Sequence, residues 1–275
     1  MFQVKSKVHG AILLAGLLCA SSGVAFADRI GHENRKSVED YATSHKISSV
    51  DARAMFGATG RIMCPFGEAS AFLVDKSNIV VTARHVLYPE KSQHSYAAHM
   101  QINRCGFEVS VDGKTSKWHK VNVTSFVYPQ EKQRSTKDRF DWVVMKLAEP
   151  VTEVAPYRLP SKAAHAEDAV TLATIRQKDF TPDDWNTRLV EDCKVRSVKS
   201  IDGIAAAGLF TDCSASPGAS GGALTRKGPD GIEVVGILSS SITKACEKYN
   251  SKSCYSYAVG LSPAVVQAIH NLAGD

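Results

Sequence analysis

The fold of this sequence is decided by the stretch Ser216-Pro217-Gly218-Ala219-Ser220-Gly221-Gly222. Ser220 lies among small residues, so the backbone can turn tightly there and a substrate carbonyl can come close. The backbone amides of Gly218 and Ser220 could then point at an oxygen that becomes negative during nucleophilic attack. Because Gly-x-Ser-x-Gly also occurs by chance in flexible loops, the pattern is informative only if the chain supplies a base and an acid elsewhere.

His85 is the candidate base. It follows the apolar, β-branched run Ile79-Val80-Val81, which predicts a buried strand, and the change to Thr82-Ala83-Arg84 marks the end of that strand. A histidine at such an end can be delivered to a cleft. A serine hydroxyl needs a neighbouring base to become a good nucleophile.

Asp141 is the candidate acid, in front of the apolar run Trp142-Val143-Val144-Met145. A carboxylate at the mouth of a buried strand is costly unless it has a partner, and an imidazole that becomes charged during catalysis is a suitable one. Asp138, three residues earlier, is the competitor. It lies in the polar run Ser135–Arg139, which is typical of a solvated loop, and Asp141 is therefore preferred.

The chain resembles the trypsin/chymotrypsin-like serine peptidases in three segments, which are Thr82-Ala83-Arg84-His85, Asp141-Trp142-Val143-Val144 and Gly218-Ala219-Ser220-Gly221-Gly222. They occur in the chain order of that family. Thr211-Asp212-Cys213-Ser214 is most similar to its bacterial glutamyl-endopeptidase-like branch, and the resemblance extends from about residue 60 to 261. It implies peptide-bond hydrolysis through an acyl-enzyme, with His85, Asp141 and Ser220 as the triad and Gly218 and Ser220 as the oxyanion hole, without a cofactor.

Many short apolar segments separated by turn-rich breaks, without helices between them, predict an all-β fold. The Pro-rich segment 149–166 divides these strands into two groups, with His85 and Asp141 in the first group and Ser220 in the second. The resemblance implies two six-stranded antiparallel β-barrels, chymotrypsin-like, with the site between them. Ser262 and Pro263 predict the start of a C-terminal helix.

The beginning of the chain has the features of a secretory signal. Lys5 and Lys7 precede the apolar stretch 11–20, and Ala25-Phe26-Ala27 is a small-x-small cleavage site. The stretch is shorter than the ~20 residues that span a bilayer, so a signal peptide over residues 1–27 is preferred to a membrane anchor. We expect residues 28–58 to be an N-terminal arm or short propeptide, residues 59–150 to hold the first barrel, and residues 151–275 to hold the linker, second barrel and helix.

Composition argues against several partners. The chain has 33 basic and 28 acidic residues, a formal net charge of +5, and the basic residues are scattered rather than gathered in a stripe. Nucleic-acid binding is therefore not expected, nor is stable membrane insertion. His94, His99 and His119 form no His-Glu-x-x-His pattern, and we expect no metal site. The expected partners are protein or peptide substrates. We expect the protein to be a monomer that acts in the periplasm or outside the cell.

Six of the seven cysteines follow the predicted signal, which indicates an oxidising compartment and three disulfides. Six cysteines allow 15 connectivities, so their number alone does not give the pairing. Cys246–Cys254 would close a polar loop. Cys193–Cys213 would tie two successive strands, a pair that the similar bacterial peptidases share. Cys64–Cys105, on either side of the His85 region, would then remain. A zinc site is the alternative, although there is no Cys-x-x-Cys pair.

The sequence departs from the family at Ala219, where trypsin-like zymogens carry an aspartate that receives the new N-terminus. We therefore expect no such ion-pair switch, and expect Pro217 and the Cys193–Cys213 bridge to hold the loop. By the resemblance, the substrate pocket would be lined by Ser214, Ala215, Leu238, Ser239 and Ser241. These residues carry no charge, and they lack the features that select basic or glutamyl side chains, so an apolar, uncharged pocket is expected.

Two alternatives remain at this point. One is a catalytically silent binding protein with a peptidase fold. The other is an α/β-hydrolase-type esterase, although in those enzymes the acid and the histidine follow the nucleophile, and only His270 comes after Ser220.

Overall fold

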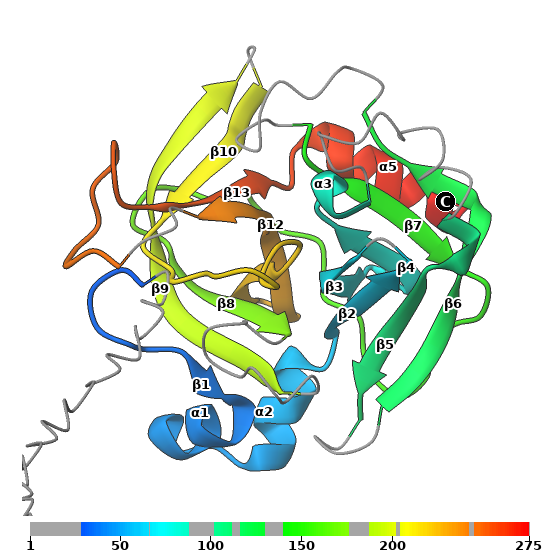
Figure 1. Ribbon diagram of the computed structural model, residues 1–275, viewed down its shortest axis with the longest axis horizontal. Coiled ribbons are helices and arrows are strands. Elements are labelled where there is room, and N and C mark those ends of the chain that lie inside the picture. The colour runs from blue at the N-terminus through cyan, green and yellow to red at the C-terminus, as the bar shows by residue number, and fades with distance from the viewer. Residues whose placement is uncertain are drawn as a thin grey trace, which may run out of the picture.

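The structure is a computed structural model, and it describes residues 29–65, 67–87, 102–111, 116–129, 140–175, 187–201, 204–241 and 245–274. The predicted signal peptide, His94, His99 and Asp138 lie outside these residues. Two β-barrels stand side by side, with the N-terminal helices below one barrel and the C-terminal helix against the other (Figure 1).

The first barrel is closed by six antiparallel strands in the order β2-β3-β4-β7-β6-β5. Their bounds are β2 Thr59–Cys64, β3 Gly67–Val74, β4 Lys76–Thr82, β5 Gly106–Ser110, β6 Ser116–Val127 and β7 Val143–Leu147. β-branched residues suit the pleated interior, and Val80, Val81, Val143 and Val144 are completely or almost completely buried there.

The second barrel has the order β9-β10-β13-β12-β11-β8 and closes through the pairing of β8 with β9. Its strands are β8 Ala169–Ile175, β9 Arg188–Ile201, β10 Ile204–Thr211, β11 Ala223–Gly228, β12 Gly231–Ser241 and β13 Ser256–Gly260. Every pairing between named strands is antiparallel, which contradicts the α/β-hydrolase alternative because that fold is built on a mostly parallel sheet.

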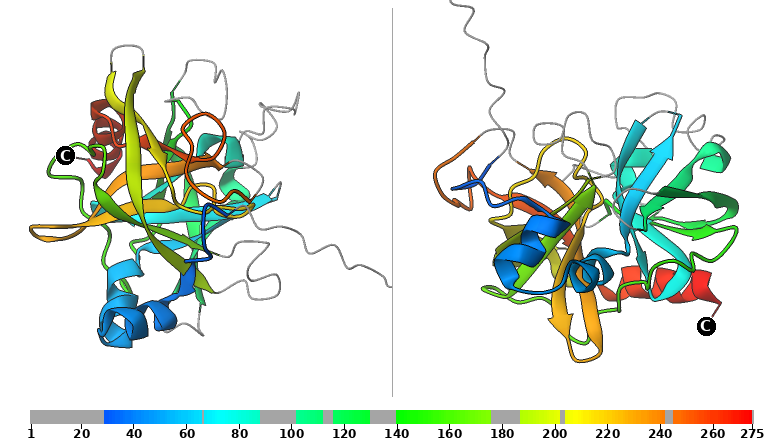
Figure 2. Two further views of the ribbon diagram at one scale, coloured as in Figure 1. Left: turned by 90° about the vertical axis from the view of Figure 1, so that its left-hand side faces the viewer. Right: turned by 90° about the horizontal axis from the view of Figure 1, so that it is seen from below.

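The helices cover the barrels at two places. The C-terminal helix α5 (Pro263–Ala273) begins after Ser262, as the sequence predicts, and packs on β4, β6 and β7 (Figure 2). Val265 and Ile269 are buried by this contact. The apolar runs of β4 and β7 do not alternate with polar residues because α5 covers the side of these strands that would otherwise face water. Two short helices, α3 (Arg84–Leu87) and the 3₁₀ helix η1 (Ile102–Arg104), complete the first barrel.

The arm before the first barrel is structured and packs on the second barrel. It consists of β1 (Lys36–Ser37), which pairs with β9, and of α1 (Val38–His45) and α2 (Ser49–Phe56). Tyr41 and Phe56 form a buried cluster with Ala173 and Val190 of the second barrel. Segments far apart in sequence are therefore joined below this barrel.

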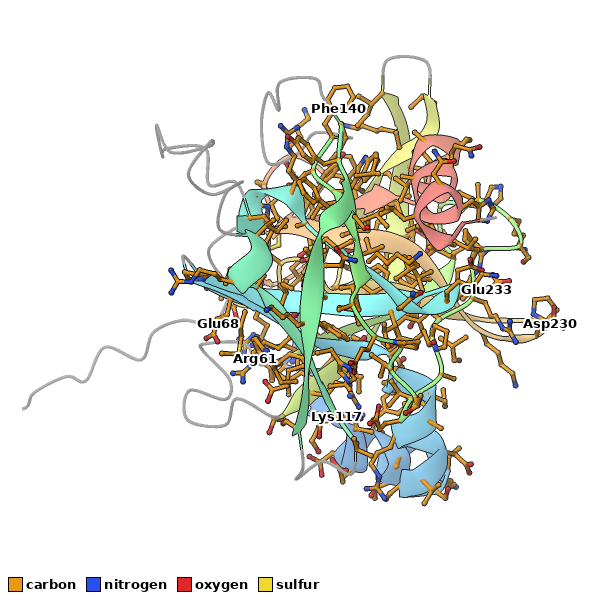
Figure 3. The ribbon with its side chains drawn as sticks, turned by 90° about the vertical axis from the view of Figure 1, so that its right-hand side faces the viewer. Arg61, Glu68, Lys117, Phe140, Asp230 and Glu233 are labelled. Carbon is orange, nitrogen blue, oxygen red and sulfur yellow. A yellow bond between two sulfur atoms is a disulfide. The ribbon has the colours of Figure 1, made fainter. Side chains whose placement is uncertain are left out.

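The linker between the barrels, residues 148–168, is hydrogen-bonded to both of them. The backbone amide of Tyr157 donates to the carbonyl of Leu73 at 3.0 Å, and the backbone amide of Arg158 donates to the carbonyl of Ile232 at 2.9 Å. Near the turn of the β11–β12 hairpin, Glu233 lies opposite Arg226 and accepts a bond from the Ser161 amide at 3.1 Å, and Asp230 lies at the tip of the hairpin (Figure 3). These contacts fix how the barrels sit relative to each other.

Candidate active site

His85 and Asp141 are brought together by the pairing of two strands. β4 and β7 run antiparallel with Thr82 opposite Val143, so the end of β4 lies beside the beginning of β7. His85 follows β4 on α3, and Asp141 precedes β7. A separation of 56 residues in sequence is thereby reduced to contact distance.

Asp141 is completely buried and receives three hydrogen bonds from residues that the structure describes. The His85 amide donates to Oδ1 at 2.9 Å, His85 Nδ1 donates to Oδ2 at 2.8 Å, and the Ser239 hydroxyl also donates to Oδ2. Three donors suit an ionised carboxylate, which can only accept. Since Nδ1 carries the proton that faces the carboxylate, Nε2 of the neutral ring acts as a hydrogen-bond acceptor.

Ser220 comes from the other barrel, in the segment between β10 and β11. Its Oγ lies 3.0 Å from His85 Nε2. The His85 side chain is 23% exposed and Ser220 is partly exposed, whereas the Asp141 side chain has no exposure. The hydroxyl therefore sits at the edge of the buried network, where it can meet both the base and a molecule from solvent.

The loop that carries Ser220 turns tightly between hydrogen bonds. The Ala219 amide donates to Ser216 at 3.0 Å and the Gly222 amide donates to Ala219 at 2.9 Å, while the amides of Gly218 and Ser220 donate to no main-chain carbonyl of the described residues. Gly218 has φ +104°, which favours glycine. These two amides can serve as an oxyanion hole.

Gly221 allows the barrels to approach each other at this loop. Its φ is +80°, and a Cβ atom there would lie 2.1 Å from Thr82 Oγ1 and 2.2 Å from the Ser70 carbonyl oxygen, both in the first barrel. A side chain at residue 221 would therefore separate the serine loop from the strand that leads to His85.

The five residues expected to line a pocket lie in one region, with differing roles. Ser214, Ala215, Leu238 and Ser239 are buried, and Ser241 is partly exposed. Ser239 bonds to Asp141, and the Ser241 hydroxyl donates to the carbonyl of Ala215 at 2.7 Å. The contact of Ser239 with the acid is a feature that the sequence analysis missed, because nothing in Ser239-Ser240-Ser241 marks one hydroxyl among three.

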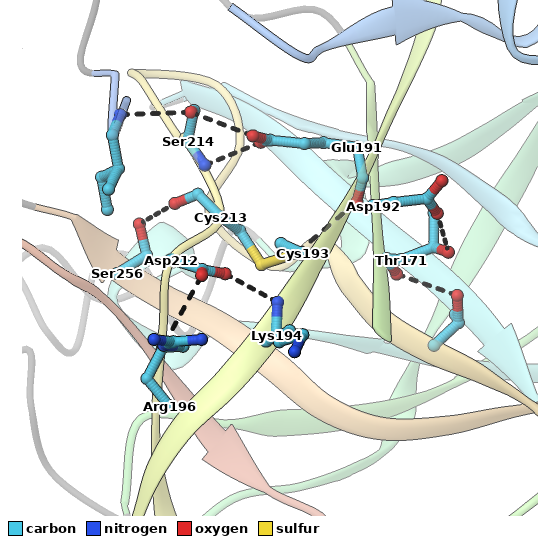
Figure 4. Close-up of a disulfide and its surroundings, with 12 residues drawn as sticks. Thr171, Glu191, Asp192, Cys193, Lys194, Arg196, Asp212, Cys213, Ser214 and Ser256 are labelled. Carbon is cyan, nitrogen blue, oxygen red and sulfur yellow. Dashed lines mark hydrogen bonds and ion pairs between the residues drawn. A yellow bond between two sulfur atoms is a disulfide. The ribbon is translucent and has the colours of Figure 1, made fainter. Parts of the chain in front are cut away.

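Glu191 is a second buried carboxyl that the sequence analysis missed. It accepts from the Ser214 amide at 2.7 Å and from the Ser214 hydroxyl at 3.1 Å, and the Ile30 amide donates to that hydroxyl at 3.3 Å (Figure 4). Burial raises the pKa of Glu191 to about 8, although the Ser214 bonds and the Arg35 charge oppose this shift. The N-terminal arm thus contacts the segment in front of the serine loop.

Three disulfides join the cysteines in the pairs that the sequence analysis expects, Cys64–Cys105, Cys193–Cys213 and Cys246–Cys254. Cys193–Cys213 links β9 to the segment that leads to Ser214 (Figure 4). Among the described residues no group of three or more histidine, cysteine or acidic side chains could hold a metal ion.

Comparison with known proteins agrees with this architecture. The family model described as Trypsin matches residues 29–264, and the chain therefore belongs to the trypsin family. A solved Glu endopeptidase, in complex with MPD, has the same fold with a TM-score of 0.63 and 13% sequence identity, over 90% of this chain and 99% of that chain. No curated protein sequence matches the chain. No helix of the described residues is long and apolar enough to cross a membrane.

Proposed function

We propose that this protein is an exported serine endopeptidase in which Ser220, His85 and Asp141 are the catalytic triad. The observation that carries the proposal is the continuous chain of hydrogen bonds from Ser220 Oγ through the His85 ring to the buried carboxylate of Asp141. Neither barrel contains this chain alone. Membership of the trypsin family supports the same reaction class.

Acylation follows from the positions of these groups. Ser220 Oγ attacks the carbonyl carbon of a peptide bond while its proton moves to His85 Nε2, and Asp141 stabilises the imidazolium that forms. The carbonyl oxygen becomes an oxyanion beside the amides of Gly218 and Ser220. The proton on His85 then passes to the leaving amine, the C–N bond breaks, and the acyl group remains on Ser220.

Deacylation repeats these steps with water as the nucleophile. Water gives its proton to His85 Nε2 and attacks the ester carbon, and the collapse of the oxyanion releases the acid product while Ser220 recovers its proton. The whole cycle uses groups of this chain and one water molecule.

The substrates that we propose are proteins or peptides with an uncharged residue before the cleaved bond. The polar groups of the pocket walls already have partners, since Ser214 donates to Glu191 and Ser241 donates to Ala215. Three disulfides are consistent with an extracellular protein, which supports export to the periplasm or medium. We further propose that the protein acts as a monomer.

The test is labelling of the protein with a fluorophosphonate, followed by intact mass and peptide mapping. The expected result is one label on Ser220 that disappears in Ser220→Ala and falls by several orders of magnitude in His85→Ala, because the serine is no longer activated. A substitution of exposed His45 outside the site, His45→Ala, is the matched control and should label normally.

Absence of label on folded, disulfide-bonded protein would contradict the peptidase proposal and favour a catalytically silent binding protein. Labelling that persists in His85→Ala would contradict only the role of His85 as the base.

A further inference from the structure

The peptide group between Gly218 and Ala219 is held at both ends. Its N–H donates to the Ser216 carbonyl at 3.0 Å, and its carbonyl accepts from the Ser70 amide at 3.1 Å and from the Ser70 hydroxyl at 2.9 Å. This peptide lies directly between the amides of Gly218 and Ser220. Rotation of the peptide would therefore turn the proposed oxyanion donors away from each other.

Ser70 reaches this carbonyl from the opposite barrel. It lies within β3 of the first barrel and is completely buried. Its hydroxyl accepts a bond from the Ile175 amide at the end of β8, at 3.0 Å. The single hydroxyl proton can go to the Gly218 carbonyl at 2.9 Å or to the Ile175 carbonyl at 3.3 Å, and the Gly218 carbonyl is the nearer acceptor. A hydroxyl that both accepts and donates forms a continuous chain, in which each bond strengthens the next.

The backbone of Ser70 is itself fixed to the strand that leads to the base. The Thr82 hydroxyl donates to the Ser70 carbonyl at 2.7 Å, and Thr82 is three residues before His85. Ser70 is thus bonded toward the histidine side through Thr82 and toward the serine side through Gly218. Ala219 offers no polar side chain for this purpose.

We propose that Ser70 is a positioning residue for hydrolysis. Its hydroxyl holds the Gly218 carbonyl, and thereby orients the amides of Gly218 and Ser220 toward the developing oxyanion. This inference rests on the proposed peptidase function. The sequence alone suggested that Pro217 and the Cys193–Cys213 bridge hold this loop. Pro217 is exposed, and we assign the anchoring of the loop to Ser70 instead.

The test is the Ser70→Ala variant of the full chain after export, assayed with p-nitrophenyl acetate and with the fluorophosphonate. We expect kcat and the labelling rate to fall about tenfold, because a loosened oxyanion site binds the transition state less well. KM should stay within about twofold and the midpoint of the pH–rate profile should not move, since the base and its carboxylate are untouched. The inhibition constant of phenylboronic acid, whose tetrahedral adduct carries an oxygen in this site, should rise by the same factor as kcat falls.

Two further variants separate positioning from general stability. Thr225→Ala removes another buried hydroxyl, which donates to the Thr171 carbonyl at 2.9 Å within the second barrel, and should keep full activity. Ser70→Thr restores a hydroxyl and should recover most of the lost rate. If Ser70→Ala does not fold, Thr82→Val is assayed instead and should lower kcat at unchanged KM.

Equal losses in Ser70→Ala and Thr225→Ala, or a loss that appears in KM alone, would overturn the inference. So would a Ser70→Thr variant that stays as slow as Ser70→Ala, or an unchanged kcat in Thr82→Val. Wild-type protein that does not label on Ser220 refutes the peptidase proposal itself. A wild-type label that forms at the same rate in Ser70→Ala refutes only the role of Ser70.

Discussion

Glu191 shows how a single buried carboxyl can make the stability of the protein depend on pH. It is 2% exposed, and desolvation is the largest cause of its raised pKa, with Glu33 acting in the same direction. The Ser214 hydrogen bonds and the Arg35 guanidinium act in the opposite direction. Because the pKa remains near 8, the folded protein holds a proton at pH 7 that the unfolded chain releases above its ordinary value of 4.5.

The sign of the effect follows from proton uptake on folding. Between about pH 5 and 8 the folded state binds one more proton than the unfolded state at this residue, so the free energy of unfolding falls as pH rises, by up to ~1.4 kcal/mol per unit. Glu191→Gln keeps an acceptor for the Ser214 amide but does not titrate. We expect urea unfolding of Glu191→Gln to depend less steeply on pH across this range. Parallel pH curves for the two proteins would show that Glu191 is ionised in the fold.

At the level of single residues, the sequence revealed the groups that lie in short motifs and missed those whose partners are distant. His85, Asp141 and Ser220 each stand in a segment with its own pattern, and the structure brings these three together. Ser70 and Glu191 stand in segments without such a pattern. Their importance depends on Gly218 and Ser214, which become neighbours only when the strands are paired.

The N-terminal arm is the element that local patterns could have revealed more fully. The sequence predicts an arm or short propeptide over residues 28–58, to which no helices are assigned above. Ser37 and Ser48 are N-caps whose side chains accept from the amides of Asp40 and Asp51, a local signal for two helix starts. That these helices pack on β8 and β9 could not be predicted, because the contact is made with residues more than a hundred positions away.

The strands themselves were predicted best where the chain is apolar. β8 coincides with the apolar segment Ala169–Ile175, whereas β6 and β9 extend beyond their apolar centres into polar residues. β2 has only a weak local signal, because Thr59-Gly60-Arg61 breaks the apolar alternation. Its place in the barrel is fixed by pairing with β3 and β5, a tertiary effect that outweighs local preference.

Removing the side chain that anchors the arm should destabilise the protein. Phe56 is 1% exposed and contacts Tyr41 edge-on, with ring centroids 5.1 Å apart. Phe56→Ala should lower the free energy of unfolding by about 3–5 kcal/mol in a urea titration, through lost burial and the cavity left behind. Val50→Ala on the same helix is the control, since Val50 is 68% exposed, and should change little. Unchanged stability, together with a mature N-terminus beyond residue 58 by mass spectrometry, would show that the arm is a removed propeptide.

On the scale of the whole molecule, Arg188 joins the two barrels. It begins β9 of the second barrel, is 6% exposed, and donates to the carbonyls of Thr59 at 3.0 Å and of Gly57 and Ser110 at 3.3 Å, all in or beside the first barrel. Burial lowers the pKa of its guanidinium. The planar group can address three carbonyls at once, which a lysine ammonium on its flexible stem cannot do in the same geometry.

Arg188→Met should therefore weaken the contact between the barrels. We expect a loss of about 3 kcal/mol in the free energy of unfolding, because buried carbonyls lose their donors. Calorimetry should show a lower transition temperature, and separate transitions if the barrels then unfold independently. Arg53→Met is the control, since Arg53 pairs with Glu39 in an exposed ion pair that contributes little. A transition that matches the wild type would show that the other contacts between the barrels hold them together without Arg188.

The docking of the arm on β9 also has a consequence for folding during translation. Lys36 pairs with Val190, so β1 and the helices after it meet their partner only when β9, much later in the chain, has been made. A chain that stops before β9 has no surface on which to bury Tyr41 and Phe56. Truncated chains would expose this apolar surface, and chaperones and proteases could distinguish them from full-length molecules by that feature.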